Sequence, residues 1–312
     1  MVNNLDYWLY MMPGHLDTFP RSRIFSGIVV AAGVVGVRGD LSVNLAEMAD
    51  WSSRYGDLLL LIQNKNFSRE IADKFLASDE ARSRFIQQVQ DLLSSTSFTG
   101  VNLDLEMVSA SSRDNLNSLV REMREEFAGN GSTLSISVPA KSSDNPGNNW
   151  NGAFDYSQLG SYCDRVMIMA YDFHWSGGPP GFISPLSWVR DVIDYAILEV
   201  PPEKIILGLP AYGYDWPAGE ENRAKGLSYN QVIKLALKYG VPQNWDQEEG
   251  ENFFTYPGED GIHNVYYHNR KSLKARCKLV LDYQLAGIII WRWGLEDLSF
   301  WEEVLPYKEI NL

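Results

Sequence analysis

Short apolar segments recur along the chain, and most are followed by a stretch whose apolar residues have helical spacing. We interpret eight of these segments as strands, at residues 7–12, 25–33, 57–64, 99–106, 133–140, 165–171, 204–213 and 286–293. Many are nearly continuous apolar runs, which is typical of parallel strands covered on both faces. Eight strands alternating with helices predict an α/β fold, a (β/α)8 TIM barrel, in preference to an open doubly wound sheet.

The predicted helices have recognisable ends. One extends over residues 68–93 and begins at Ser68, and another ends at Asn130–Gly131. A third has Ser184 as its cap and Pro185 at its first position, and Pro201–Pro202 ends it. Two more span residues 228–240 and 269–287. The connection between residues 12 and 25 is too short and Pro-rich for a full helix, so we expect an irregular barrel there.

Residues 249–268 interrupt this alternation. They look like two strands around the turn PGEDG, and we predict a hairpin-bearing insertion after strand seven. The insertion is too short for a separate domain, and no linker or repeat divides the chain, so residues 1–312 are predicted to form one domain. The glycines at 33, 36 and 39 lack the spacing of a dinucleotide-binding loop.

The segment at residues 99–108, TGVNLDLEMV, alternates strictly between polar and apolar side chains. Asn102, Asp104 and Glu106 therefore share one face of a strand, and Val101 and Leu103 lie on the other. In a parallel barrel the polar face points inward, and the site lies at the carboxyl ends of the strands. Two carboxyl groups in such a place cannot both ionise easily, so one of them is expected to retain a proton and act as a general acid.

Composition narrows the choice of partners. The chain of 312 residues is 45% hydrophobic and carries a formal net charge of −13. An acidic chain of this kind does not attract a phosphate backbone, so nucleic acid is not expected as a partner. Ten Trp, sixteen Tyr and thirteen Phe could stack on sugars, although most must belong to the core.

Cysteines and histidines point to no metal. Cys163 and Cys277 are too few for a disulfide framework or a zinc cluster, and we expect two buried thiols. His263 and His268 are expected at the surface and His174 in a loop, so no metal or organic cofactor is predicted. No apolar run approaches the roughly 20 residues that a membrane span needs. The N-terminal residues lack the features of a signal peptide.

Four segments together carry a resemblance to a known family. TGVNLDLE at 99–106 resembles the strand-four motif DGxDxDxE of glycoside hydrolase family 18, and VMIMAYDF at 166–173 resembles its MxYD on strand six. LGLPAYGYDW at 207–216 and GIIIWRWGL at 287–295 resemble strands seven and eight. Residues 179–216 and 227–240 look especially like the bacterial spore cortex and peptidoglycan-fragment N-acetylglucosaminidases.

The resemblance implies roles for individual residues. Glu106 stands at the position of the general acid, and Asp104 at that of the carboxylate that orients the 2-acetamido group of the substrate. That group itself attacks the anomeric carbon, the substrate-assisted exception among retaining glycosidases. Tyr171 matches the tyrosine that hydrogen-bonds the acetamido oxygen. The remaining substrate-binding positions are Asn102, Met169, Asp172, Tyr212 and Trp291, with Trp291 beneath the sugar at the cleavage subsite.

Two positions depart from the family motif. Thr99 replaces the first acid, which puts in question the fine tuning of the carboxyl pair but not the acid itself. Asn102 replaces the second acid, and this is usual in the cortex-lytic subgroup. Four further tryptophans could contact sugars or simply pack, namely Trp8, Trp175, Trp216 and Trp293.

These observations predict a retaining hydrolase of β-linked N-acetylglucosamine, acting as a monomer on peptidoglycan or spore cortex fragments. The alternatives are a chitinase acting on chitin oligomers, a catalytically silent lectin for N-acetylated sugars, and an unrelated barrel enzyme. The sequence leaves the compartment open, and the resemblance suggests action in the cell envelope, in the spore or outside the cell.

Overall fold

The computed structural model describes residues 5–14, 25–44, 56–218 and 223–304. Eight parallel strands close into a barrel in the order β1-β14-β8-β7-β6-β5-β4-β2, and pairing of β2 with β1 completes the circle. All eight predicted strands are present, which confirms the TIM barrel. Their bounds are β1 Asp6–Met11, β2 Gly27–Val35, β4 Asp57–Asn64, β5 Gly100–Asp104, β6 Thr133–Pro139, β7 Arg165–Met169, β8 Ile205–Pro210 and β14 Gly287–Trp291. A short strand, β3 Leu41–Val43, adds to β2 antiparallel.

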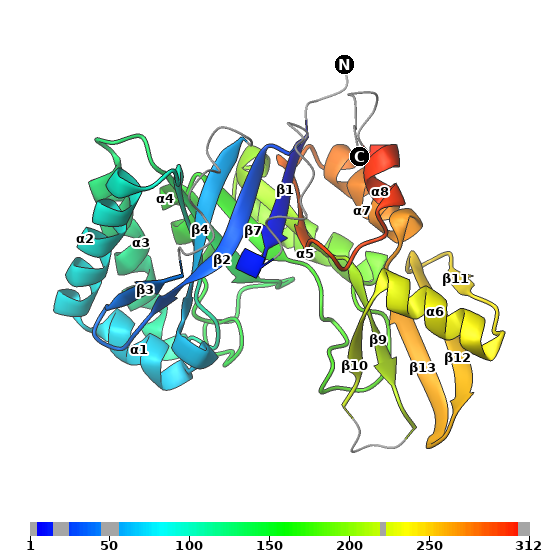
Figure 1. The fold of residues 1–312 in the computed structure, drawn as a ribbon. Helices are drawn as coiled ribbons and strands as arrows, with labels where there is room; N and C mark the ends of the chain where they lie inside the picture. The colour runs from blue at the N-terminus through cyan, green and yellow to red at the C-terminus, as the bar shows by residue number, and fades with distance from the viewer. Residues whose placement is uncertain (1–4, 15–24, 45–55, 219–222, 305–312) are drawn as a thin grey trace.

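Helices surround this barrel, apart from α6, which lies against the second sheet described below (Figure 1). They are α1 Arg69–Ala77, α2 Asp79–Ser95, α3 Arg113–Phe127, α4 Tyr156–Tyr162, α5 Leu186–Glu199, α6 Tyr229–Tyr239, α7 Arg270–Asp282 and α8 Ser299–Val304. The single helix predicted over 68–93 is wrong, because Ser78 has extended dihedral angles and its side chain caps α2. Pro185 is the N-cap of α5, so this helix begins one residue later than predicted. Most of the connection between residues 12 and 25 lies outside the described residues.

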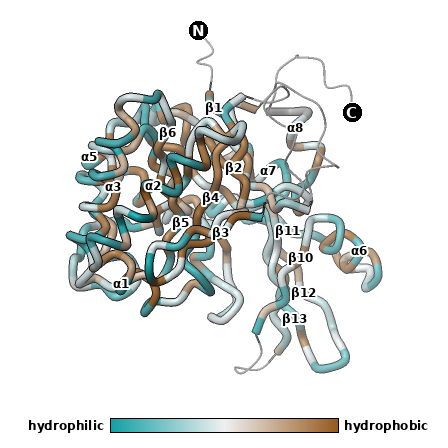
Figure 2. Tube along the Cα trace, turned by 60° about the vertical axis from the view of Figure 1, so that its left-hand side comes forward, coloured by the Kyte–Doolittle hydropathy of each residue, from teal (hydrophilic) through white to brown (hydrophobic). Residues whose placement is uncertain are grey.

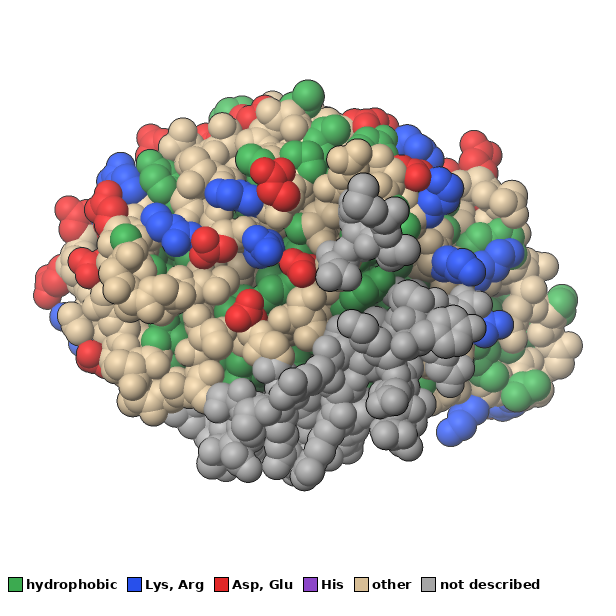
Figure 3. Space-filling model, turned by 90° about the horizontal axis from the view of Figure 1, so that it is seen from above, with side chains coloured by type: hydrophobic (Ala, Val, Ile, Leu, Met, Phe, Trp, Pro, Cys, Tyr) green, Lys and Arg blue, Asp and Glu red, His purple; other side chains and the backbone are tan. Residues whose placement is uncertain are grey.

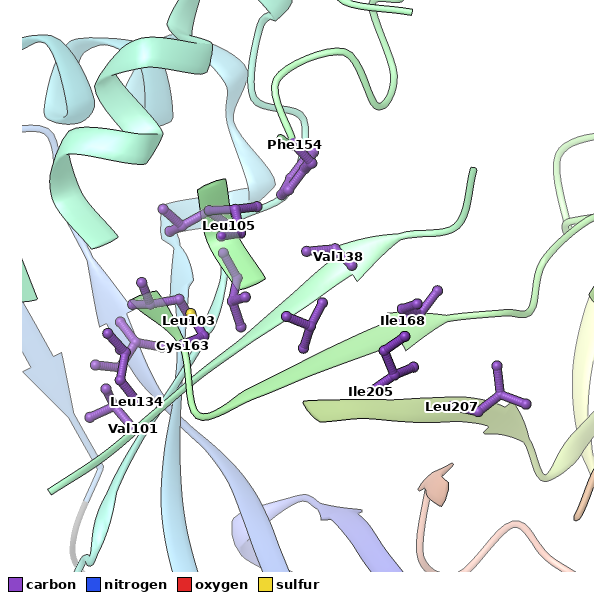
Figure 4. Packing of buried hydrophobic residues seen from close by; sticks show 14 of the residues in the cluster. Val101, Leu103, Leu105, Leu134, Val138, Phe154, Cys163, Ile168, Ile205 and Leu207 are labelled. Carbon is purple, nitrogen blue, oxygen red and sulfur yellow. The ribbon is translucent and has the colours of Figure 1, made fainter. Parts of the chain in front are cut away.

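The strands bury different residues on their two faces. Val101, Leu103 and Leu105 of the β5 segment point away from the barrel axis into the layer beneath the helices, where residues such as Leu134 and Ile168 pack against them (Figure 4). Trp8, Tyr10, Val29, Leu59, Leu61, Met167, Ile206 and Ile289 fill the barrel interior. Figure 2 shows the apolar character concentrated on the central strands. The register of β5 that puts Asn102 and Asp104 inside is therefore held by burial of its alternate residues.

A second, antiparallel sheet lies beside the barrel and projects from it (Figure 1). Its order is β10-β9-β13-β12-β11, with bounds β9 Tyr212–Trp216, β10 Lys225–Ser228, β11 Asn244–Asp246, β12 Glu251–Gly258 and β13 Gly261–Tyr267. The predicted hairpin is confirmed as β12 and β13, but the strand predicted over 204–213 divides between the barrel and this sheet. The excursion therefore begins near residue 212. We call the sheet together with α6 the lobe. One domain for residues 1–312 stays a prediction.

The lobe has its own small core and helix caps. Val232 of α6 and Phe254 of β12 belong to a buried apolar cluster that is separate from the two clusters of the barrel. Ser228 and Gln231 form a capping box at the start of α6, and Gly240 ends the helix in the left-handed region at φ 62°. These are the helix ends that the sequence predicts.

A buried ionic group joins the lobe to the barrel. The carboxylate of Glu251, at the start of β12, accepts hydrogen bonds from the backbone amides of Ile183 at 2.9 Å and Ser184 at 2.5 Å. The guanidinium of Arg276 and the Nε2 atom of His268 lie 3.2 and 3.3 Å from the same carboxylate. Burial lowers the pKa of His268 to about 4. The expectation that His268 lies at the surface is therefore wrong.

Two other expectations concern the cysteines and His263. Cys163 and Cys277 are free and buried, as predicted. His263 is not a surface residue but is partly buried in the lobe, where Nδ1 lies 2.8 Å from Asp215 and Nε2 lies 2.7 Å from Asp260.

On the face shown in Figure 3, Lys and Arg side chains lie among Asp and Glu side chains.

Candidate active site

The predicted site residues gather at the carboxyl ends of the barrel strands. Asp104 is the last residue of β5, and Glu106 follows it by two positions. Tyr171 and Asp172 follow the end of β7 by two and three residues, and Trp291 ends β14. This end of a barrel is where the loops after the strands can converge on one substrate.

Asn102 supports the site from inside the barrel. Its side chain is fully buried and does not line the cavity described below. Its Nδ2 donates to the hydroxyl of Ser135 at 3.0 Å, and its Oδ1 accepts from Ser137 at 2.8 Å. Ser137 is in turn hydrogen-bonded to the hydroxyl of Tyr10 at 2.7 Å. Asn102 therefore links β5 to β6 two residues before Asp104, and its predicted role in substrate binding stays a prediction.

Thr99 lies at the opposite end of the strand. Its hydroxyl accepts from the amide of Leu58 at 3.1 Å and donates to the carbonyl of the same residue at 3.3 Å. Five residues of extended chain separate Thr99 from Asp104, roughly 16 Å. Replacement of the first motif acid by Thr99 therefore changes a contact between the beginnings of β5 and β4 and does not touch the carboxyl pair.

The two carboxyl groups perturb each other. Asp104 is only 6% exposed, and its Oδ1 has no hydrogen-bond partner among the described residues. Burial, with the nearby charge of Glu106, raises the pKa of Asp104 to about 8. Burial, with the charge of Asp172, also raises the pKa of Glu106. The pair therefore holds a proton near neutral pH, which is the requirement for a general acid.

Asp172 is held by two tyrosines of the lobe. The hydroxyl of Tyr212 donates to its Oδ1 at 2.5 Å, and that of Tyr214 donates to the same atom at 3.1 Å. Burial raises the pKa of Asp172 although these two bonds act in the opposite direction. Tyr212 is 6% exposed, so its hydroxyl serves Asp172 and not an open face of the site. The lobe thus positions a carboxyl group of the barrel.

The backbone at Glu106 is fixed by a residue that the sequence did not single out. Oδ1 of Asn64, the last residue of β4, accepts from the amide of Glu106 at 2.9 Å, and its Nδ2 donates to the carbonyl of Ser68 at 3.0 Å. Asn64 is completely buried. The available signal was a polar residue at the carboxyl end of an apolar strand.

A cavity of about 440 Å³ opens beside the carboxyl group of Glu106. Met169, Tyr171 and Asp172 line it, as does Trp175 among the four additional tryptophan candidates. Trp150 and Trp188 also line it, and sequence reasoning missed both. Trp8, Trp216 and Trp293 are instead buried.

Trp291 occupies a different part of the barrel mouth. Its ring packs edge to face against Tyr10, with centroids 5.2 Å apart and planes at 63°, and it does not line the cavity. β14 and β5 lie on opposite sides of the barrel, separated by β8, β7 and β6 in one direction. The predicted sugar platform and the carboxyl pair therefore face each other across the mouth.

The described part of the chain offers neither a metal site nor a membrane-spanning helix. Within the described ranges, no three His, Cys, Asp or Glu side chains are grouped so that they could hold a metal ion. Among the same residues, no helix has the length and apolar character needed to cross a membrane.

Comparison with known proteins gives consistent matches. Residues 38–296 match the family described as Glycosyl hydrolases family 18. YdhD of Bacillus subtilis (strain 168) is 33% identical over 267 residues, which cover 83% of this chain and 63% of YdhD. The cortical fragment-lytic enzyme of Bacillus anthracis is 32% identical over 244 residues, or 77% of this chain and 56% of that enzyme.

The fold comparison agrees. The crystal structure of the Bacillus cereus spore cortex-lytic enzyme SleL superimposes with a TM-score of 0.87 at 26% identity, covering 96% of this chain and 73% of that one. The chain spans only about 56 to 63% of the two curated relatives that it matches above. The match over residues 38–296, the identity to YdhD and the barrel together show that the chain belongs to glycosyl hydrolase family 18.

Proposed function

We propose that this protein is a retaining glycosidase that cleaves β-linked N-acetylglucosamine by substrate-assisted catalysis, with peptidoglycan or spore cortex fragments as substrate. The observation that carries the proposal is the carboxyl pair at the barrel mouth. Asp104 and Glu106 lie two residues apart with raised pKa values beside a cavity lined by tryptophan. The names of the two lytic relatives support cortex fragments as the substrate class.

Glu106 is the proton donor in this proposal. Glu106 lines the cavity, and burial raises its pKa, which favours the protonated form that a proton donor needs. Proton transfer to that oxygen removes the leaving sugar as an alcohol. The same carboxylate then accepts a proton from the water that opens the cyclic intermediate, so the acid is regenerated.

Asp104 orients the 2-acetamido group. The carbonyl oxygen of that group attacks the anomeric carbon, and positive charge develops on the resulting oxazolinium ring. The proton of the pair lies on Glu106 in this state, so Asp104 is the carboxylate that accepts a hydrogen bond from the ring N–H. The developing positive charge favours this ionised form of Asp104. Its unsatisfied Oδ1 is the atom available for this contact. Tyr171, beside Asp104 in the cavity wall, donates its hydroxyl to the acetamido oxygen.

Replacement of Glu106 by Gln tests the proton donor. We expect wild type to release N-acetylglucosamine ends from reduced peptidoglycan fragments or from chitin oligomers, with the β-anomer formed first, as followed by mass spectrometry and NMR. Glu106→Gln should be slower by about 10²–10⁴-fold, the usual contribution of a general acid. The matched control is Glu203→Gln, which removes an exposed carboxylate before β8 and leaves the site intact.

The outcomes separate the alternatives. Turnover of chitin oligomers but not peptidoglycan fragments selects the chitinase. Equal inertness of wild type and Glu106→Gln, with sugar binding retained, identifies a lectin and overturns the hydrolase. A first-formed α-anomer would contradict the retaining mechanism. The monomeric state stays a prediction that sedimentation measures directly.

A further inference from the structure

The cavity beside Glu106 lies on the leaving side of the bond that the proposed reaction breaks. Its walls come from the loops after β5, β6 and β7 and from α5, whereas Trp291 ends β14 on the opposite side of the barrel. A sugar whose anomeric carbon reacts above Trp291 presents its glycosidic oxygen to Glu106. The next sugar unit, which departs with that oxygen, then enters the cavity.

The charges in this cavity have one sign. Glu106 and Asp172 are the ionisable acids of its wall, and no Lys or Arg of the described chain lines it. Much of the remaining wall is aromatic. Trp150 is 59% exposed and Trp175 is 53% exposed, and Trp188 lies beside them. Exposed rings around a concave surface are suited to the apolar faces of a sugar.

Two cations beside the loop that carries Trp150 are engaged in other contacts. Lys141 is 3% exposed, and its Nζ donates to Asp144 at 2.7 Å and to the carbonyl of Phe154 at 2.6 Å. Arg113 donates to Asp144 at 2.9 Å and to the carbonyl of Gly152 at 2.8 Å. Both side chains hold the loop that carries Trp150 into the cavity. Turning either toward a ligand would break the contacts that shape the wall.

We propose that this cavity selects an uncharged N-acetylated sugar as the leaving unit and discriminates against one bearing a free carboxylate. This proposal rests on the proposed function and specifies, in addition, the charge of the preferred substrate. A carboxylate here would lie beside Asp172, whose carboxylate accepts hydrogen bonds from Tyr212 and Tyr214. The space is partly desolvated and its described wall offers no cationic partner, so the two like charges repel strongly. An uncharged sugar meets the tryptophans without that penalty.

Two nearly isosteric substrates test the proposal. One is an oligosaccharide of alternating N-acetylglucosamine and N-acetylmuramic acid with free lactyl carboxylates, and the other is the same oligosaccharide with every carboxylate converted to its methylamide. We expect kcat/KM of wild type to be at least about tenfold higher for the methylamide, a ratio that corresponds to about 1.4 kcal/mol of repulsion. Equal values, or a preference for the carboxylate, would overturn the proposal.

A cation placed in the wall should reduce the preference. Trp150→Arg adds a planar cation that can still stack on a sugar, and Trp150→Gln removes the ring without adding charge. We expect Trp150→Arg to narrow the ratio of the two kcat/KM values at least about threefold and Trp150→Gln to leave it near that of wild type. An identical ratio in both variants would show that the cavity wall does not discriminate between substrates by their charge.

Binding to Glu106→Gln distinguishes this proposal from the proposed hydrolysis. Calorimetric titration of that variant with both oligosaccharides gives the charge preference without turnover. If wild type hydrolyses neither substrate but Glu106→Gln binds the methylamide more tightly, the hydrolysis is wrong and the selection holds. Absence of binding by either oligosaccharide overturns both.

Discussion

Replacing Asp104 by Asn should stabilise the protein while it abolishes the proposed reaction. The pKa of Asp104 rises from 3.8 to about 8 on folding, because the side chain is buried beside Glu106. The folded state therefore binds more protons than the unfolded state between about pH 4 and pH 8, and stability falls as pH rises through this window. An amide at position 104 does not titrate.

The magnitude follows from the shift. At pH 7 the carboxyl group costs about 4 kcal/mol of folding free energy, from 1.36 kcal/mol for each of the roughly three pH units above its ordinary pKa. Asp104→Asn should recover this cost at pH 7 and almost none at pH 4. For a chain of 312 residues the recovered free energy corresponds to about 6 °C in Tm. Any cost of fitting the amide itself is the same at every pH.

Urea unfolding followed by tryptophan fluorescence between pH 4 and pH 9 measures the effect. The expected result is a difference in unfolding free energy, variant minus wild type, that grows with pH and levels off above about pH 8. The matched control is Asp91→Asn, which removes a carboxylate from the exposed face of α2. A difference that stays flat from pH 4 to pH 8, or shrinks as pH rises, would refute the reasoning. Activity on oligosaccharides should fall about 10²–10³-fold, as expected for loss of an electrostatic stabiliser.

Three further perturbations follow from contacts around the site. Asn64→Ala leaves the amide of Glu106 without its acceptor, so kcat should fall about tenfold with little change in KM. Steady-state kinetics measures both constants, and an unchanged kcat would mean that Asn64 has only a structural role. Glu251→Gln leaves the buried guanidinium of Arg276 without its carboxylate partner. The free energy of unfolding measured in urea should fall by about 3–5 kcal/mol, and a loss under 1 kcal/mol would contradict this expectation. Burial lowers the pKa of His263, but hydrogen bonds to Asp260 and Asp215 outweigh burial and raise this pKa. The charged contacts of His263 therefore stabilise the folded state fully below about pH 6.5, and this stabilisation is lost as pH rises. His263→Gln should therefore lower Tm more at pH 6 than at pH 9, and an equal loss at both would exclude the ion pair as its cause.

The alternation of residues 101–106 predicted both the strand and the inward placement of Asp104. Side chains two apart on a strand share a face whatever the rest of the fold does, so this prediction needs only local geometry. Burial of Val101, Leu103 and Leu105 in the layer beneath the helices confirms it. The apolar runs predicted all eight barrel strands for a related reason, because strands covered on both faces must be apolar throughout.

Boundaries that depend on neighbouring elements were harder to predict from the sequence. The apolar run at 204–213 continues without a visible break, yet β8 ends at Pro210 and β9 begins at Tyr212 in another sheet. What separates them is the partner strand, β14 for one and β13 for the other. His268 is likewise buried where Arg276, from α7, approaches the same carboxylate of Glu251.

The sequence by itself determined the barrel, the carboxyl pair and the family motif, because each is written in residues close together in the chain. Only the tertiary structure decided which side chains surround that pair. Asn64 reaches Glu106 across 42 positions, and Trp150 and Trp188 line one cavity from a loop and a helix, respectively. The spacing of such residues in sequence carries no periodic signal, because the folded backbone and not local geometry brings them within reach.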